Sequence, residues 1–137
     1  MNILRSWNLV PMPIGMQGEY AAEKFLRSQG YHLLARNLHL PQGEIDRLML
    51  APDGRTLVIV EVKTRSLQEN AGTDNPRPEV HVNFAKERKL TTLAMQLLRQ
   101  KKYADHPVRF DVVGVDVPQQ GRPIIRHHPG AFEAAWG

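Results

Sequence analysis

Hydrophobic positions change their spacing several times along the chain, and each change predicts a new helix or strand. Within residues 17–29, Ala22, Phe25 and Leu26 recur at helical spacing, and Gly30 is a typical residue to follow a helix end. A second apolar stripe at positions i, i+3, i+4, i+7 and i+8 predicts an amphipathic helix. Its members are Leu90, Leu93, Ala94, Leu97 and Leu98. Each helix therefore has one apolar face that can pack against a hydrophobic core.

Five other segments, rich in apolar and β-branched residues, predict β-strands. They cover residues 31–38, 44–50, 56–63, 108–117 and 123–127. The second and third are joined by Pro52-Asp53-Gly54, where Pro fixes φ and Gly accepts a positive φ, so they predict a β-hairpin. The order is helix, three strands, loop, helix and two strands. It indicates an α/β fold with a mixed sheet flanked by helices.

The chain of 137 residues suits one domain rather than two. Residues 1–15 contain two prolines and no clean apolar core, so we expect a flexible arm followed by a single domain over residues 16–137. Residues 64–84 have no sustained periodicity and predict a long irregular loop. Residues 130–136 predict a short closing helix or a frayed tail.

Composition excludes several classes of protein. Hydrophobic residues make up 42% and charged residues 23%, which excludes a wholly disordered chain. The absence of cysteine excludes disulfide scaffolds, thiolate zinc sites and Cys nucleophiles. No apolar run approaches the roughly 18 residues of a membrane span, and the amino terminus is a poor signal peptide. We therefore expect a soluble, cytoplasmic protein.

The formal net charge of +4 is concentrated in one segment. Residues 86–103 alone carry a net +5, so the remainder of the chain sums to −1. The basic residues there are Lys86, Arg88, Lys89, Arg99, Lys101 and Lys102, and we expect one helix over residues 86–102 to present them. A local excess of this kind favours a surface for a polyanion, although a solvated helix face is the commoner reason for a charge run.

The predicted hairpin brings acidic and basic residues together. A turn centred between Asp53 and Gly54 places Asp46 opposite Glu61 and Glu44 opposite Lys63. Glu61 and Lys63 share one face of their strand because successive side chains alternate. We therefore expect the side chains of Asp46, Glu61 and Lys63 to converge, with the intervening valines on the opposite face.

Two opposed carboxylates repel each other, and a divalent cation resolves the conflict. Mg²⁺ binds one or two carboxylates together with waters and phosphate oxygens, and it can activate a water for phosphodiester hydrolysis. Lys63 would stabilise the developing phosphate charge or orient that water. The alternative is an ordinary salt-bridge cluster in which Glu61 pairs with Lys63 or Arg47.

Motifs over most of residues 18–117 carry a resemblance to a known family. They are Gly18-Glu19-x-x-Ala22 with Phe25-Leu26, Gly30-Tyr31, Arg36-Asn37, Gly43-Glu44-Ile45-Asp46, Val60-Glu61-Val62-Lys63-Thr64-Arg65, Lys86 at a helix start and Arg109-Phe110-Asp111. In their order and spacing the chain resembles the bacterial YraN-like uncharacterised family, uncharacterised protein family 0102. This family is placed in the PD-(D/E)XK nuclease-like superfamily.

The resemblance implies a restriction-endonuclease-like core with Mg²⁺ or Mn²⁺ at an acidic site. Asp46 matches the motif Asp of the superfamily, and Glu61 with Lys63 matches its (D/E)-x-K pair. Glu19 matches a helix glutamate of resolvase-like members, so metal ligation is expected from Asp46, Glu61 and Glu19. Ile45 stands where the superfamily is named for a proline. The implied reaction is hydrolysis of DNA, with branched or structured DNA as one substrate class.

Several readings stay open at this point. The candidate contacts to nucleic acid are Arg65, Lys86, Lys89, Lys101 and Lys102. The sequence does not decide between DNA and RNA, and superfamily nucleases that cut both strands often pair, which leaves room for a homodimer. A non-catalytic nucleic-acid-binding module of the same fold and an interaction protein are the alternatives to an enzyme.

Overall fold

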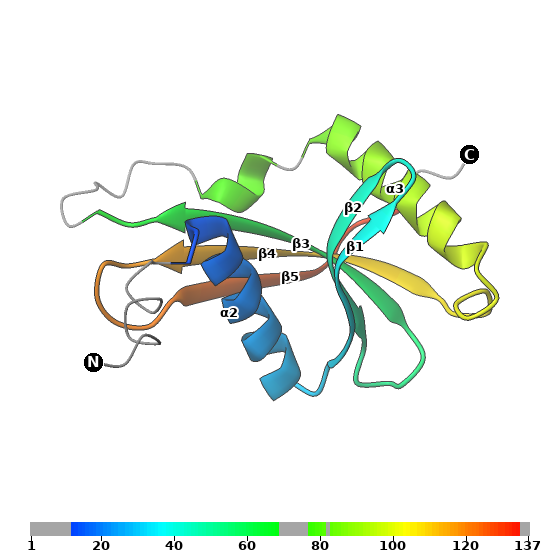
Figure 1. The fold of residues 1–137 in the computed structure, drawn as a ribbon, viewed down its shortest axis with the longest axis horizontal. Coiled ribbons are helices and arrows are strands. Elements are labelled where there is room, and N and C mark those ends of the chain that lie inside the picture. Colours follow the sequence, from blue (N-terminus) through cyan, green and yellow to red (C-terminus); the bar gives the residue numbers. More distant parts are fainter. Residues whose placement is uncertain (1–11, 69–76, 82, 135–137) are drawn as a thin grey trace, which may run out of the picture.

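Residues 12–68, 77–81 and 83–134 are described by the computed structural model (Figure 1). One five-stranded sheet in the order β1-β2-β3-β4-β5 carries two α-helices and a short 3₁₀ helix. The elements are α2 (Ile14–Ser28), β1 (His32–Leu40), β2 (Gly43–Leu50), β3 (Leu57–Ser66), η1 (Pro78–His81), α3 (Phe84–Leu98), β4 (Val108–Val117) and β5 (Ile124–Phe132). The element order predicted from the sequence is confirmed.

The sheet is mixed because one of its four pairings is parallel. β1–β2, β2–β3 and β4–β5 run antiparallel, whereas β3 and β4 run parallel. A parallel pair needs a long crossover, and here the crossover contains η1 and α3. The expected fold class, an α/β fold with a mixed sheet flanked by helices, is confirmed.

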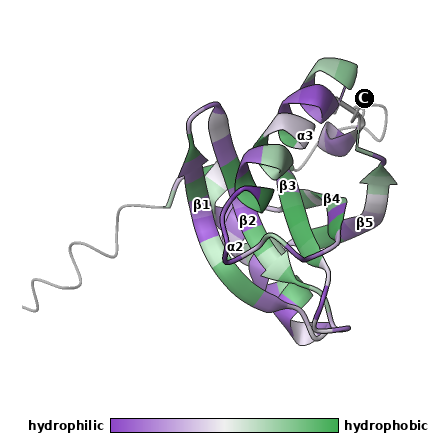
Figure 2. Cartoon of the chain, turned by 90° about the vertical axis from the view of Figure 1, so that its right-hand side faces the viewer, coloured by the Kyte–Doolittle hydropathy of each residue, from purple (hydrophilic) through white to green (hydrophobic). Residues whose placement is uncertain are grey.

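Two apolar layers hold the helices on opposite faces of the sheet. Leu57 and Ile59 of β3 pack with the apolar stripe of α3. Val58 and Val60, the residues between and after them, pack with Leu26 of α2 on the other face. Figure 2 shows the hydrophobic strands β3 and β4 between the two helices. The alternation predicted for this strand is confirmed, so Glu61 and Lys63 belong to the α3 face.

β3 and β5 extend well beyond the segments that the sequence pattern indicated. β3 continues to Ser66, because β4 offers it parallel partners as far as Val117. The start of the expected irregular loop is therefore strand. β5 continues to Phe132, whose ring stacks on Phe110 at 4.7 Å. The prediction of a short closing helix or tail from residue 130 is wrong as far as Phe132, and residues 135–137 lie outside the described chain.

The basic segment is only partly helical. Asn83 caps α3 by accepting a hydrogen bond from the Lys86 backbone N–H at 3.0 Å, and the helix ends at Leu98. Lys101 and Lys102 lie in the turn that follows. A helix continuing as far as Lys102, as expected for the basic surface, is therefore wrong.

At the amino-terminal side, α2 begins at Ile14, within the segment expected to be a flexible arm. Residues 1–11 of that arm lie outside the described chain. Across the described residues, no helix combines the length and the apolar character needed to cross a membrane.

Candidate active site

The strands β2 and β3 separate at the candidate site. Their backbone pairs run from Leu50↔Leu57 to Arg47↔Val60, which confirms the predicted register. Beyond that pair, β2 continues only with β1 and β3 continues only with β4. Asp46 and Glu61 are therefore the first residues of a fork rather than members of a closed ladder.

Asp46 fills this fork with its side chain. Its Oδ2 accepts a hydrogen bond from the Val62 backbone N–H at 2.9 Å. A carboxylate thus takes the N–H of a strand that has lost its neighbouring backbone partner. Glu44 does not face Lys63 as expected, because its partner across the ladder is His39 of β1.

Burial, followed by the nearby Glu61 charge, raises the pKa of Asp46 from 3.8 to about 7. Glu19 acts in the same direction, whereas the Val62 N–H and Lys86 favour the ionised form. Two like charges near a buried carboxyl oppose its ionisation. Burial is the largest cause and the acidic neighbours add to it, so the folded site disfavours an ionised Asp46.

Glu61 is buried, with a side chain only 6% exposed. Its Oε1 lies 3.5 Å from the Lys63 ammonium and 3.3 Å from that of Lys86. Its Oε2 is buried without a hydrogen-bond partner. A buried carboxylate oxygen without a partner is costly, so this atom indicates a place for a cation or a donor. The Glu61–Lys63 pair of the alternative salt-bridge reading is present, and Lys86 joins it.

Glu19 reaches the site from the other face of the sheet. It follows Gly18, where a Cβ atom would overlap the Thr64 side chain, so only glycine lets α2 approach β3 this closely. Glu19 Oε1 accepts hydrogen bonds from Asn37 Nδ2 at 2.9 Å and from Arg47 Nη1 at 3.2 Å. The glutamate singled out by the motif is therefore close to Asp46 but already fixed by two donors.

Asn37 joins two acidic side chains, and sequence reasoning gave it no role of its own. Its Nδ2 donates to Glu19 and to Glu44, each at 2.9 Å, while its Oδ1 accepts from Arg47 at 3.3 Å. Asn37 has a φ of +46°, unusual for a residue with a side chain within a strand. The strained backbone and the amide bridge point to a positioning role.

A buried ion cluster supports Glu19 and was also missed. Arg47 is 1% exposed and donates from Nε to Glu23 Oε1 at 2.8 Å. Arg36 binds the same carboxylate with two hydrogen bonds of 2.8 Å. The guanidinium groups lower the pKa of Glu23, with the Arg36 hydrogen bond as the largest cause. The sequence signal for this cluster was Arg47, a charged residue directly before the apolar run Leu48-Met49-Leu50 of β2.

Comparison with known proteins assigns the family. Residues 18–115 match the model of "Uncharacterised protein family UPF0102". The chain belongs to this family. A UPF0102 protein of Geotalea daltonii is 39% identical over 90% of this chain and 91% of its own length. A UPF0102 protein of Symbiobacterium thermophilum is 41% identical over 88% and 97%, respectively. The matched segment contains all the residues of the fork.

Among solved structures, the UPF0102 chain is similar to SfsA of Pyrococcus furiosus in complex with Ca²⁺. The likeness has a TM-score of 0.35 and 10% sequence identity. It covers 80% of this chain and 59% of SfsA.

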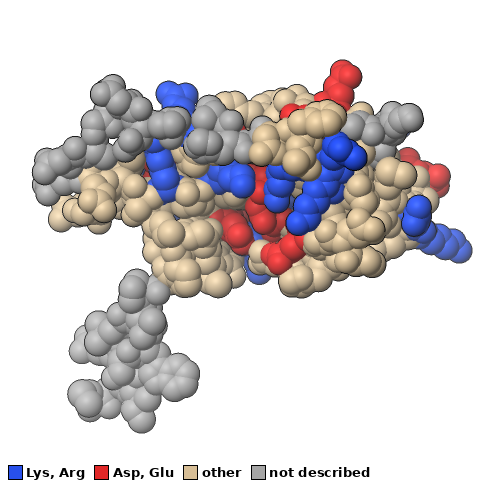
Figure 3. Space-filling model, turned by 90° about the horizontal axis from the view of Figure 1, so that it is seen from above, with Lys and Arg blue, Asp and Glu red and all other residues tan. Residues whose placement is uncertain are grey.

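The basic residues proposed to contact nucleic acid do not form one continuous surface: some lie near the fork and others lie away from it. Lys86 lies at Glu61, and Lys89 covers Gly43 at the tip of the β1–β2 hairpin. Arg65 donates to Asp116 at 2.8 and 3.1 Å, while Lys102 lies over the Tyr103 ring at the other end of α3. Figure 3 shows acidic side chains at the centre of one face with Lys and Arg on both sides.

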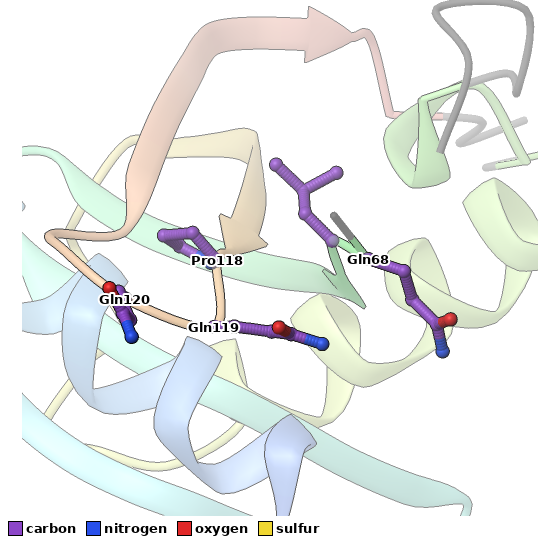
Figure 4. Close-up of a pocket in the computed structure, with 5 residues that line it drawn as sticks. Gln68, Pro118, Gln119 and Gln120 are labelled. Carbon is purple, nitrogen blue, oxygen red and sulfur yellow. The ribbon is translucent and has the colours of Figure 1, made fainter. Parts of the chain in front are cut away.

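A separate pocket of about 390 Å³ lies where β3 ends. Its lining includes Leu67 and Gln68 after β3 and Pro118, Gln119 and Gln120 after β4 (Figure 4). None of these described lining residues carries a charge. These described lining residues therefore offer no acid, base or metal-binding carboxylate.

Proposed function

We propose that the chain is a metal-dependent endonuclease that hydrolyses phosphodiester bonds in DNA. The observation that carries this proposal is the buried, unpartnered Glu61 Oε2 near the Asp46 carboxyl, whose pKa is raised to about 7. Both features are expected of an acidic site that gains a divalent cation, because the cation partners the oxygen and favours the ionised carboxyl.

The donor set suits Mg²⁺ or Mn²⁺. Within residues 12–68, 77–81 and 83–134, no three acidic or histidine side chains are grouped tightly enough to hold an ion alone. Two carboxylates, those of Asp46 and Glu61, would hold the metal, and waters and phosphate oxygens would complete the octahedron. A metal held there would polarise the phosphodiester and lower the pKa of a bound water.

The chain's own residues have separate tasks in this proposal. Asp46 and Glu61 bind the cation from the two sides of the fork. Lys63, 3.5 Å from Glu61 Oε1, is free to turn toward the phosphate once the metal neutralises that carboxylate. Asn37 and Arg47 already hold Glu19 Oε1, so Glu19 would use its other oxygen to orient a water at the site.

The motif order supports the same assignment. Asp46, Glu61 and Lys63 follow the order and spacing of the PD-(D/E)XK motif, and this resemblance supports their proposed roles. The proposed DNA path runs over Lys86 and Lys89 at the start of α3, beside the fork. Cutting both strands would need two active sites, so we include a homodimer in the proposal.

A cleavage screen with Mg²⁺ and Mn²⁺ over linear, flapped and four-way DNA tests this function. The parental protein is expected to give metal-dependent product, and Asp46→Asn and Glu61→Gln are expected to give none. Asp105→Asn removes an exposed carboxylate elsewhere and is expected to cleave like the parental protein. Equal cleavage by parental protein and Glu61→Gln would show that a contaminant or another site does the cutting.

A second candidate function rests on one observation. Lys63 and Lys86 both lie within 3.5 Å of Glu61 Oε1, so the chain itself partly neutralises the acid that would bind metal. A nucleic-acid-binding module without turnover would keep this arrangement. It would bind DNA with a steep salt dependence and yield no product with either metal.

A further inference from the structure

A groove separates α2 from the segment that leads into β5. It has a volume of about 590 Å³, within the range of sites that hold small ligands and peptide side chains. Its floor is apolar and consists of Ala21, Phe25, Pro123 and Ile125. The groove lies on the α2 side of the sheet and includes none of the acidic residues of the fork.

The floor is an exposed edge of the core. Ala21, Phe25 and Ile125 are half-buried and pack against the apolar layer beneath α2. The groove therefore presents partly exposed apolar surface next to the core, as at sites that bind another protein.

Tyr20 forms a rigid wall at one side of the groove. Tyr20 is 41% exposed, and two guanidinium groups lie over its ring. The Arg36 and Arg47 groups lie 5.4 and 5.1 Å from the ring centroid. An aromatic ring that is already fixed loses little conformational entropy on binding, which is typical of an anchor position in an interface.

The charges at the rim define the partner. Lys24 on α2 and Arg122 after the β4–β5 turn line the groove, are exposed, and come from different elements. No acidic side chain lies among the described lining residues. An apolar floor with a cation from each side is complementary to a peptide in which carboxylates flank an apolar side chain. Nucleic acid would call for a longer track of cations and a flatter stacking surface.

We propose that this groove binds an acidic, amphipathic peptide segment of a partner protein. An apolar side chain of the peptide enters between Phe25 and Ile125 and contacts Tyr20. The peptide carboxylates pair with Lys24 and Arg122. This surface is independent of the acidic fork, so it recruits a partner whether or not the fork hydrolyses DNA.

Panning a random dodecapeptide phage library on the full chain tests the proposal. Enriched peptides are expected to combine aspartate or glutamate with a neighbouring Phe, Leu or Ile. When synthesised with a fluorescent label, they are expected to bind the double variant Lys24→Glu/Arg122→Glu about tenfold or more weakly than the parental chain. Both substituted residues are exposed, and matching circular dichroism spectra would confirm that the variant is folded.

The matched control is Lys101→Glu/Lys102→Glu, which makes the same charge change after α3. It is expected to bind the selected peptides like the parental chain. Absence of enrichment, or equal binding by both double variants, would overturn the proposal. It would also be overturned if a labelled oligonucleotide, and not the peptides, lost affinity in Lys24→Glu/Arg122→Glu, because the groove would then contact nucleic acid. Cleavage by the fork enters none of these readouts.

Discussion

Val62 donates its backbone N–H to Asp46 Oδ2 at 2.9 Å, beyond the last backbone pair between their strands. At the fork, the Asp46 carboxylate accepts the hydrogen bond that a backbone carbonyl of β2 would accept in a continuous ladder. This bond fixes the Asp46 carboxyl beside β3 even though β2 has turned away. The acidic site therefore forms where the backbone pairing of β2 with β3 ends, at Arg47↔Val60.

Substitution Asp46→Asn is expected to stabilise the metal-free protein at neutral pH. The pKa of Asp46 is raised from 3.8 to about 7 in the folded state, so folding favours its protonated form. The parental protein accordingly loses stability as pH rises from about 4 to about 7, because the unfolded state gives up the proton first. Asn avoids this cost and keeps an oxygen for the Val62 N–H. The gain is expected to reach on the order of 2 kcal/mol.

Urea denaturation at several pH values, with a chelator present, measures this effect. The difference between Asp46→Asn and the parental protein should be small near pH 4, grow toward pH 7 and then level off. Adding Mg²⁺ above pH 7 should stabilise the parental protein and not the variant. A difference that is the same at every pH would contradict the raised pKa of Asp46.

The sequence predicted the parts of the site that depend on local rules. Strand alternation and a turn signal were enough to place Glu61 and Lys63 on one face and to set the register that brings Asp46 near them. The termination of the ladder could not be predicted, because β2 leaves β3 to follow β1. The expected contact of Glu44 with Lys63 failed for that reason.

Long-range packing explains the other misses. Asn37 reaches Glu19 only because Gly18 allows α2 to approach β3, and Arg47 finds Glu23 across the same interface. Nothing in local spacing pairs these residues, which are separated by at least 18 positions. The end of β5 similarly depends on a partner in β4.

Substitution Gly18→Ala is expected to lower the free energy of unfolding by about 2 kcal/mol, because its methyl group would overlap the Thr64 side chain. Shortening the opposing residue with Thr64→Ala should recover part of this loss in the double variant. Chemical denaturation of the two single variants and the double variant gives the coupling energy. Gly15→Ala, at a helix position with open space around it, is the control and should cost little. Strictly additive losses would show that the two side chains do not meet.

Substitution Asn37→Asp is expected to destabilise the site by placing a third carboxylate between Glu19 and Glu44. The amide donates to both acids, and an ionised Asp would repel both. We expect a loss of about 2 kcal/mol at pH 7 and a smaller loss near pH 4, where the introduced Asp carries less charge. Asn37→Gly accommodates the positive φ but lacks the amide. Its loss of stability therefore measures the amide bridge without a contribution from backbone strain. If Asn37→Gly and Asn37→Asp lose equal stability at both pH values, the amide does not hold the two acids apart.

Substitution Arg126→Gln is expected to break a second ion cluster, which ties η1 to the sheet. Arg126 binds Glu79 with hydrogen bonds of 2.6 and 2.9 Å and Asp116 with two of 2.9 Å. Burial alone would raise the pKa of both carboxyls, but the hydrogen bonds from Arg126, together with those from Arg65 to Asp116 and from His128 to Glu79, outweigh it and hold each pKa at about 2. Removing the guanidinium leaves two buried acids without their shared cation. A loss of about 3 kcal/mol is expected at pH 7.

The pH dependence separates this cluster from a simple packing defect. A lowered carboxyl pKa stabilises the fold above about pH 4, and that contribution disappears as pH falls toward 2. The difference between the parental protein and Arg126→Gln should therefore be largest above pH 5 and decrease on acidification. Guanidinium chloride would screen the charges, so urea denaturation is the suitable measurement. Arg99→Gln, at an exposed position after α3, should leave stability nearly unchanged. A loss at Arg126→Gln that persists undiminished near pH 2 would assign its role to packing rather than to charge.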